Sequence, residues 1–201
     1  MKKTLVLLAG YPGTGKSYLC KLILKMENNF CVLSPDEIKE KFWDEVGFDN
    51  EVEKQNLIEL GWQYYYDNLD RYMQGGVSLI SDYPFSNKQK ADLKQKTEKY
   101  SYQVLTIRLV ADLDILFERQ KRRDLDDGRH LGHIASIYHK GDIIADRHAA
   151  DKLLSYDEFI ERCKTRGYGT FCLGELIEVD VTDFSKVNYS DILQRIGLFI
   201  K

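Results

Sequence analysis

Long apolar runs are missing from this sequence of 201 residues. No stretch approaches the roughly 20 consecutive apolar residues that cross a bilayer as a helix. An apolar run at residues 5–9 follows two lysines, but it is shorter than the apolar part of a signal peptide and continues directly into a glycine-containing stretch. We therefore expect a cytoplasmic protein without a membrane segment, in which residues 5–9 form a buried strand.

Cysteine pairs and an excess of basic charge are also missing. The four cysteines are Cys20, Cys31, Cys163 and Cys172, and none forms a Cys-x-x-Cys pair. Scattered cysteines in a chain of this length are typical of reduced thiols in a cytosolic protein. The 29 lysines and arginines do not outnumber the 32 aspartates and glutamates, so the formal net charge is −3. This excludes a chain built mainly to coat nucleic acid, although a local basic groove stays open.

Short apolar runs alternate with longer amphipathic stretches along the chain. The expected strands are residues 5–9, 30–33, 77–81, 103–110 and 176–181. The expected helices are residues 17–26, 35–43, 51–74, 86–99, 113–123 and 190–200, with a polar loop at 125–134 and one or two more helices within 135–171, clearest at 156–164. This alternation predicts an α/β fold with a parallel sheet and helices on both faces, in one domain over residues 1–201.

The stretch GYPGTGKS at residues 10–17 fits the phosphate-binding pattern G-x-x-x-x-G-K-[ST] at every fixed position. Its glycines let backbone N–H groups turn toward phosphate oxygens, and the following helix adds the positive end of its dipole. We expect Lys16 to reach the β- and γ-phosphates of ATP and the Ser17 hydroxyl to bind Mg²⁺. The nucleotide-binding residues predicted here are Gly10, Tyr11, Pro12, Gly13, Thr14, Gly15, Lys16, Ser17 and Tyr18.

The rest of the chain separates three classes of P-loop protein. GTPases normally carry Asn-Lys-x-Asp, and the nearest stretch, NKQK at residues 87–90, has lysine where aspartate is needed. Motor and AAA-type ATPases usually end the third strand with Asp-Glu, in which the glutamate polarises water, whereas here Asp82 precedes Tyr83. An enzyme that transfers phosphate to a substrate gains by not activating water, so the sequence favours a kinase.

Two further features support a kinase. Asp36 follows the second expected strand, at the edge of the sheet where doubly wound folds bind ligands, and its carboxylate can accept the proton of an attacking hydroxyl. The alternative is an acid in the first turn of the helix that Ser34 would cap. Arg119 and Arg123 share a helix face, so one can stack on a base while the other neutralises phosphate charge; the alternative is a solvated basic face.

With these motifs the sequence resembles the P-loop kinases related to adenylate kinase. The nearest branch holds bacteriophage polynucleotide 5′-kinase, zeta-toxin-like kinases and chloramphenicol phosphotransferase. The matching residues are 10–17, Asp36 with Lys39, Asp82, Arg119, Arg123, RHLGH at 129–133 and VDVT at 179–182. The resemblance implies a three-layer P-loop NTPase fold with a five-stranded parallel sheet in the order 2-3-1-4-5, and a lid at about residues 119–133.

The resemblance also implies a role for each matching residue. Asp36 would be the catalytic base and Lys39 a cation on the substrate side, while Asp82 would order Mg²⁺ or its waters beside the substrate. Arg119 would contact adenine, and Arg123 and Arg129 would contact the phosphoryl group in transfer.

Three departures from the family pattern bear on the acceptor. Lys39 stands where the polynucleotide 5′-kinase has arginine, and the two side chains are not interchangeable at a bidentate phosphate site. Leu131 replaces the usual proline of the RHLGH element. Residues 134–174 exceed what compact members carry, and we expect them to form a substrate cap.

Histidine and tryptophan side chains give two more hypotheses. His130 and His133 have no further ligand at zinc spacing, so a role in the lid or at phosphate is favoured over metal binding. Trp43, close behind Asp36, is the aromatic residue best placed to stack on a planar substrate; the alternative is packing in the core.

The sequence thus predicts a kinase, dependent on ATP and Mg²⁺, that phosphorylates a hydroxyl of a small-molecule or nucleotide-like acceptor. One alternative is a protein that binds ATP as a sensor without transfer. The other is a nucleic-acid 5′-hydroxyl kinase, for which the net charge gives no support.

Overall fold

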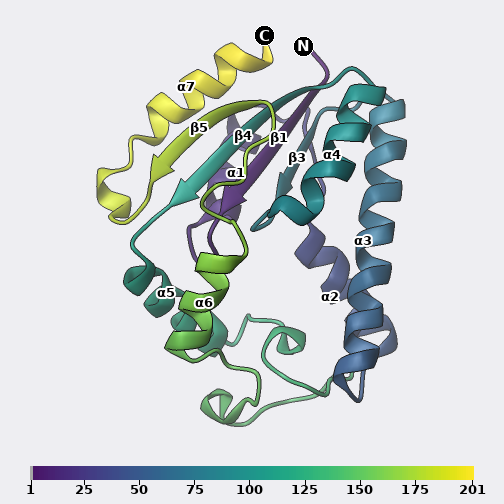
Figure 1. Cartoon of the computed structure of the whole chain (residues 1–201), viewed down its shortest axis with the longest axis vertical. Helices are drawn as coiled ribbons and strands as arrows, with labels where there is room; N and C mark the ends of the chain where they lie inside the picture. Colours follow the sequence, from purple (N-terminus) through teal and green to yellow (C-terminus); the bar gives the residue numbers. More distant parts are fainter. Residues whose placement is uncertain (1) are drawn as a thin grey trace.

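β1 (Thr4–Gly10) is buried along its whole length in the computed structural model, which describes residues 2–201. Its odd-numbered side chains pack into one hydrophobic cluster and its even-numbered ones into another. A continuous apolar strand of this kind fits only between two layers of helices. The apolar run predicted to be a buried strand is therefore the centre of the fold (Figure 1).

Four other strands flank β1 in a parallel sheet. They are β2 (Cys31–Val32), β3 (Leu79–Asp82), β4 (Gln103–Val110) and β5 (Glu175–Asp180). The strand order is β2-β3-β1-β4-β5 and every pair is parallel, which confirms the predicted topology. β2 is shorter than the predicted strand 30–33. The loops after β1, β2 and β3 meet at one edge of the sheet, because parallel strands end on the same side.

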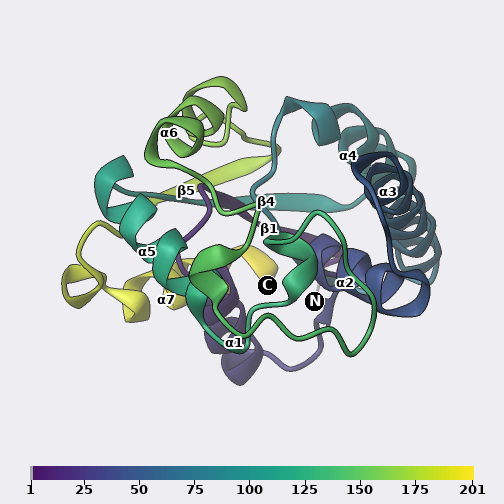
Figure 2. The same ribbon diagram turned by 90° about the horizontal axis from the view of Figure 1, so that it is seen from below.

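Helices cover both faces of the sheet, as predicted. They are α1 (Lys16–Met26), α2 (Pro35–Val46), α3 (Glu51–Gln74), α4 (Asn87–Lys99), α5 (Leu113–Leu125), α6 (Tyr156–Thr165) and α7 (Tyr189–Ile200). α1 and α7 pack on one face through the cluster that holds Val6 and Leu8. α3 and α4 pack on the other, as the view from below shows (Figure 2).

The segment between α5 and α6, residues 126–155, holds no α-helix, and the single helix found within 135–171 agrees with the expectation of one or two there. Of the one or two helices expected within 135–171, only α6 is an α-helix; the short turns Leu131–His133 and Arg147–Ala149 are 3₁₀ helices. Aspartate side chains of this segment accept hydrogen bonds from nearby backbone N–H groups, at His139, His148 and Ser136. Such local bonds compete with helix formation. We call residues 126–155 the connecting segment.

None of the helices formed by residues 2–201 is long and apolar enough to cross a membrane.

Candidate active site

The loop between β1 and α1 has the backbone geometry that its glycines predict. Gly10, Gly13 and Gly15 have φ angles of 107°, 80° and 81°, a region that side chains with a Cβ rarely adopt. A Cβ on Gly10 would also lie 1.9 Å from the carbonyl oxygen of Leu109, so only glycine fits there. α1 begins at Lys16 directly after this loop, and its first N–H groups face the same space.

Lys16 is folded into the loop. Its Nζ donates to the carbonyl oxygen of Tyr11 at 2.7 Å and to that of Gly10 at 3.4 Å. Burial, and after it the nearby charge of Arg123, lower the pKa of Lys16 to about 8, against the opposing charges of Asp36 and Asp82. The third partner of Nζ is the Thr14 hydroxyl, at 3.4 Å, so this buried ammonium has only neutral oxygens as hydrogen-bond partners and is poised to bind an anion.

Ser17 and Asp82 lie side by side at the ends of α1 and β3. The Ser17 hydroxyl donates to Oδ2 of Asp82 at 2.8 Å. Burial raises the pKa of Asp82, although its hydrogen bonds from Ser17 and Ser34 lower it. Mg²⁺ is usually bound by one or two protein oxygens together with phosphate oxygens. The Ser17 hydroxyl and the Asp82 carboxylate fit this pattern, because a cation would offset the cost of burying the charged carboxylate.

Asp36 lies in the first turn of α2, where the loop after β2 reaches the edge of the sheet. Its Oδ1 is 2.7 Å from Nζ of Lys39, and the side chain of Asp36 remains 35% exposed. Burial alone would raise the pKa of Asp36, but the charges of Lys39, His133 and Arg129 outweigh it and hold that pKa below its usual range. Ser34 precedes the helix without a capping hydrogen bond from its side chain. The carboxylate is therefore ionised and open to an acceptor.

Arg123 and Arg129 come from α5 and from the connecting segment. Arg123 donates to Oε1 of Gln120 at 2.8 Å, and Arg129 donates to Oδ1 of Asp124 at 3.2 Å. Arg123 lies close enough to Arg129 to act on it: the pKa of Arg129 is lowered first by burial and then by the charge of Arg123. Because Arg123 also acts on Lys16 and Arg129 on Asp36, the structure gathers these four charges around one space.

Arg119, on α5, lies beside the P-loop, where a Cβ on Gly13 would come within 3.5 Å of its own Cβ. Its guanidinium donates to the carbonyl oxygens of Val181 and Thr182 at 2.9 and 2.8 Å. One face stacks on Phe184, with 3.8 Å between the guanidinium carbon and the ring centroid. Gly15 also lies against this ring. The resulting platform beside the P-loop fits a nucleotide base.

The other predicted residues of the P-loop have structural contacts. Thr14 donates its hydroxyl to the carbonyl oxygen of Tyr11 at 2.8 Å, which closes the loop. The ring of Tyr11 meets that of Tyr168, just after α6, edge to face at 6.4 Å. Tyr18 is 55% exposed and packs edge to face on Tyr189.

The connecting segment is docked on α2. Phe48 and Tyr138 exchange two backbone hydrogen bonds of 2.8 and 2.9 Å in an antiparallel bridge. Nε2 of His133 lies 2.7 Å from Glu40, and that of His130 lies 3.1 Å from Asp44. Neither histidine contact resembles a metal site. Seen from below, the connecting segment lies in front of the sheet (Figure 2).

Trp43 is buried in this docking contact. The side chain is 2% exposed, and its ring lies 5.6 Å from that of His130 and 5.0 Å from that of His133. It belongs to an apolar cluster with Leu131 and Ile134. In this conformation the ring is covered, so it does not offer a face for stacking on a substrate.

Docking through Trp43 leads to a prediction about stability. A Cβ on Gly132 would lie 2.4 Å from Cε3 of Trp43, so Gly132→Ala should lower the free energy of unfolding by about 2 kcal/mol through overpacking. Hydrogen exchange of residues 130–138 should also become faster. Gly75→Ala is the matched control, because its Cβ would make an ordinary contact of 3.5 Å. Equal stability and exchange in both variants would contradict the docking.

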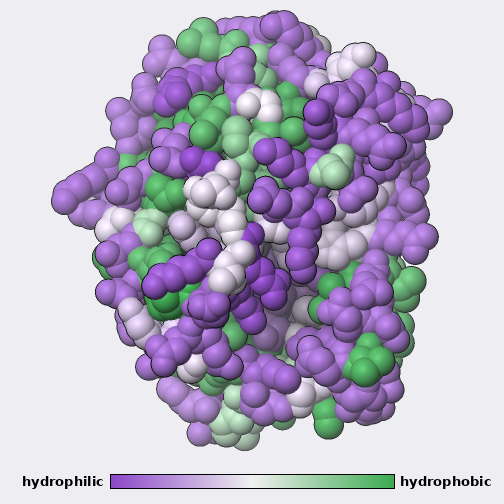
Figure 3. Space-filling model, in the orientation of Figure 1, coloured by the Kyte–Doolittle hydropathy of each residue, from purple (hydrophilic) through white to green (hydrophobic). Residues whose placement is uncertain are grey.

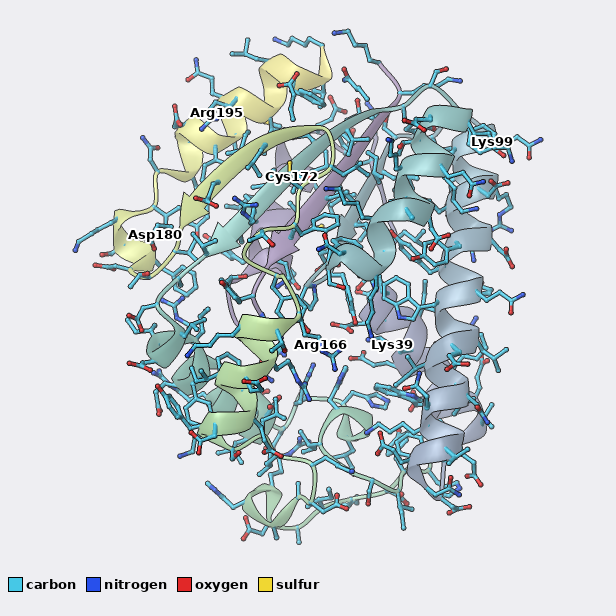
Figure 4. All side chains as sticks on the ribbon, in the orientation of Figure 1. Lys39, Lys99, Arg166, Cys172, Asp180 and Arg195 are labelled. Carbon is cyan, nitrogen blue, oxygen red and sulfur yellow. The ribbon has the colours of Figure 1, made fainter. Side chains whose placement is uncertain are left out.

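Figure 3 shows a hollow between α6 and α3, with hydrophilic residues around its rim. Figure 4 places Lys39 on the α2 side of this opening and Arg166, at the end of α6, on the other. Tyr83 lies beneath Lys39, with 4.7 Å from Nζ to the ring centroid, and Trp62 packs edge to face on Tyr83 at 5.0 Å. The aromatic wall next to Asp36 is thus formed by Tyr83 and Trp62.

Sequence reasoning missed two residues of the site. Phe184 follows β5, and its only signal is its position after the VDVT stretch. The only signal at Tyr83 is that it follows Asp82 in place of the glutamate of an ATPase. The sequence does not show that Arg119 stacks on Phe184 or that Lys39 lies over Tyr83, because these pairs come from segments far apart in the chain.

Comparisons with known proteins agree with this geometry. A family profile described as an AAA domain matches residues 5–135. No curated protein matches the sequence.

Several solved structures share the fold. A candidate kinase from Chloroflexus aurantiacus has a TM-score of 0.75 and 21% identity over 100% of this chain and 97% of its own. A sugar kinase from Janibacter has a TM-score of 0.56 and 12% identity over 100% and 95%. A gluconokinase from Sinorhizobium meliloti has a TM-score of 0.51 and 11% identity over 95% and 87%. At these identities the likeness is one of fold.

Proposed function

The chain belongs to the AAA-domain family of P-loop kinases, and from this premise we propose that it transfers the γ-phosphate of ATP to a hydroxyl group. The acceptor in this proposal is a small molecule or a nucleotide-like compound. The observation that carries it is the ionised, partly exposed carboxylate of Asp36, placed within electrostatic reach of Lys16. A protein that only binds ATP has no need of such a group.

The nucleotide would lie along the P-loop. Backbone N–H groups of the loop and of the first turn of α1 would hold the phosphates, and Lys16 would exchange its carbonyl partners for phosphate oxygens. The platform of Arg119 and Phe184 would hold the base. Mg²⁺ bound by Ser17 and Asp82 would neutralise phosphate charge.

Asp36 would orient the acceptor hydroxyl in line with the γ-phosphate and take its proton. Arg123 and Arg129 would face the charge that develops on the phosphoryl oxygens, and each could contribute several kcal/mol of transition-state stabilisation. The docked connecting segment would keep water from this space. The side chain after Asp82 is Tyr83, which cannot polarise water as a glutamate does.

The test is a screen for transfer of ³²P from γ-labelled ATP to pooled acceptors. The pools hold sugars and sugar acids first, because two proteins of similar fold are described as a sugar kinase and a gluconokinase. Nucleosides, nucleotide-sugars, aminoglycosides, chloramphenicol-like compounds and 5′-hydroxyl oligonucleotides follow. We expect one labelled pool. Strongly salt-dependent labelling of oligonucleotides would favour the nucleic-acid kinase instead.

The pKa of Lys16 leads to a prediction about ATP binding. With a pKa of about 8 in the free protein, Lys16 loses its charge as the pH rises through that value, whereas bound phosphate keeps it protonated. Affinity for ATP should be constant below about pH 8 and fall up to about tenfold per unit above it. Calorimetry in two buffers at about pH 9 should show proton uptake on binding. Constant affinity between about pH 7 and 9.5 would contradict this, and Lys16→Arg should remove the fall.

A further inference from the structure

Lys39 is almost completely enclosed, although it is a lysine at the mouth of the candidate site. Its side chain is 10% exposed, and Nζ contacts Asp36 at 2.7 Å. The same Nζ lies over the ring of Tyr83, 4.7 Å from its centroid. An ammonium engaged by a carboxylate and by a ring face has little left to offer a substrate anion.

Gly61 supplies the space that the stem of Lys39 occupies. It is buried in the middle of α3, where glycine costs about 1 kcal/mol relative to alanine. A Cβ at this position would lie 3.2 Å from Cγ of Lys39 and 3.8 Å from its Cα. The glycine therefore lets α2 and α3 approach closely enough to hold Lys39 along its length.

We propose that Lys39 is a positioning residue, seated against Gly61, that fixes the Asp36 carboxylate in its catalytic orientation and does not bind an anionic group of the acceptor. This rests on the proposed kinase function, and it replaces the role that family resemblance implies for Lys39. As a consequence, the part of the acceptor that lies beside Asp36 and Lys39 needs a hydroxyl but no phosphate or carboxylate group. The wall of Tyr83 and Trp62 then fits the face of a neutral ring.

Other charged groups also face Asp36, so the effect of Lys39 has to be separated from theirs. They are Lys16 of α1, Glu37 of α2, Asp82 of β3, and Arg129 and His133 of the connecting segment. Lys39 is the one in direct contact with the Asp36 carboxylate, with 2.7 Å between Nζ and Oδ1. Removing the charge of Lys39 should therefore change the pKa of Asp36 more than removing any one of these other charges.

The first test follows the Asp36 carboxyl directly and needs no acceptor. Protein labelled with ¹³C at the aspartate carboxyl carbon is titrated by NMR, with Asp36→Asn to identify the signal. Lys39→Met should raise the pKa of Asp36 by about one unit or more relative to wild type, and Lys39→Arg should restore it. The control is Lys41→Met, because Lys41 is 58% exposed on the same helix. An unchanged Asp36 titration in Lys39→Met would overturn the proposal.

The second test uses transfer to the acceptor found in the screen. Lys39→Met should lower kcat about tenfold or more and bring an acid limb into the pH profile, with the KM for ATP unchanged. Gly61→Ala should lower kcat in the same direction without loss of thermal stability, because alanine favours the helix. A raised KM for the acceptor with unchanged kcat and pH profile would instead show that Lys39 binds the acceptor. If wild type transfers no phosphate, the kinase function fails, and the NMR titration still decides whether Lys39 controls Asp36.

Discussion

Lys16→Ala should abolish phosphate transfer, with a loss of at least about 10³-fold in kcat. The ammonium of Lys16 is buried inside the P-loop, and no other side chain of the loop carries a positive charge. Alanine would remove the group that faces the β- and γ-phosphates in the ground state and the transferring phosphoryl in the transition state. The measurement is product formation at saturating ATP, together with ATP affinity.

Lys21→Ala is the matched control, because it removes an exposed lysine from the same helix. It should keep the rate of wild type. Transfer by Lys16→Ala within about tenfold of wild type would show that the P-loop is not the catalytic centre.

Asp36→Asn should lower kcat about 10²-fold or more while ATP affinity stays near that of wild type. The amide keeps the shape of the carboxylate but cannot accept the proton of the acceptor hydroxyl. It also leaves the ammonium of Lys39 without its partner, so we expect some loss of stability, and folding is checked by thermal denaturation. Rates are then compared at a temperature where both proteins are folded.

Glu45→Gln on the same helix is the control for Asp36, because Glu45 is 57% exposed and paired only with Lys41. It should leave kcat unchanged. Unchanged turnover in Asp36→Asn would assign Asp36 to the stabilisation of the α2 N-terminus, which is the alternative that the sequence left open.

Local patterns were enough to predict the sheet and the P-loop. The apolar run at residues 5–9 has no polar position, so it could only be a strand buried on both faces, and β1 is that strand. The spacing of Gly10, Gly15 and Lys16 reflects positive φ angles and the start of a helix, both of which are properties of the local backbone. Strand order followed from the family resemblance and is confirmed.

Contacts between distant segments could not be predicted in the same way. Trp43 and Asp36 are close in sequence, but the burial of Trp43 depends on a connecting segment that begins about 80 residues later and folds without helical periodicity. The packing of the Lys39 side chain likewise depends on Gly61, which in the sequence is only an unfavourable residue within a long helix. The contact of Lys39 exists because α3 returns along α2.

The assignments of Asp36, Arg123 and Arg129 remain predictions with geometric support. The structure brings these charges to one edge of the sheet, where the charge of Arg129 lowers the pKa of Asp36 and the charge of Arg123 lowers that of Arg129. A kinase differs from an ATP sensor in transferring the γ-phosphate to an acceptor, so a measurement of phosphate transfer separates the two.

The measurement that tests the central claim most directly is the fate of the γ-phosphate. Wild-type protein is incubated with γ-³²P-labelled ATP, Mg²⁺ and increasing concentrations of the acceptor from the screen, and ADP, labelled acceptor and inorganic phosphate are quantified. The kinase account predicts that ADP and phosphorylated acceptor form in equal amounts and that both require Lys16 and Asp36. If ADP instead matches inorganic phosphate at every acceptor concentration, or ATP binds and no ADP forms, the protein does not act by phosphate transfer.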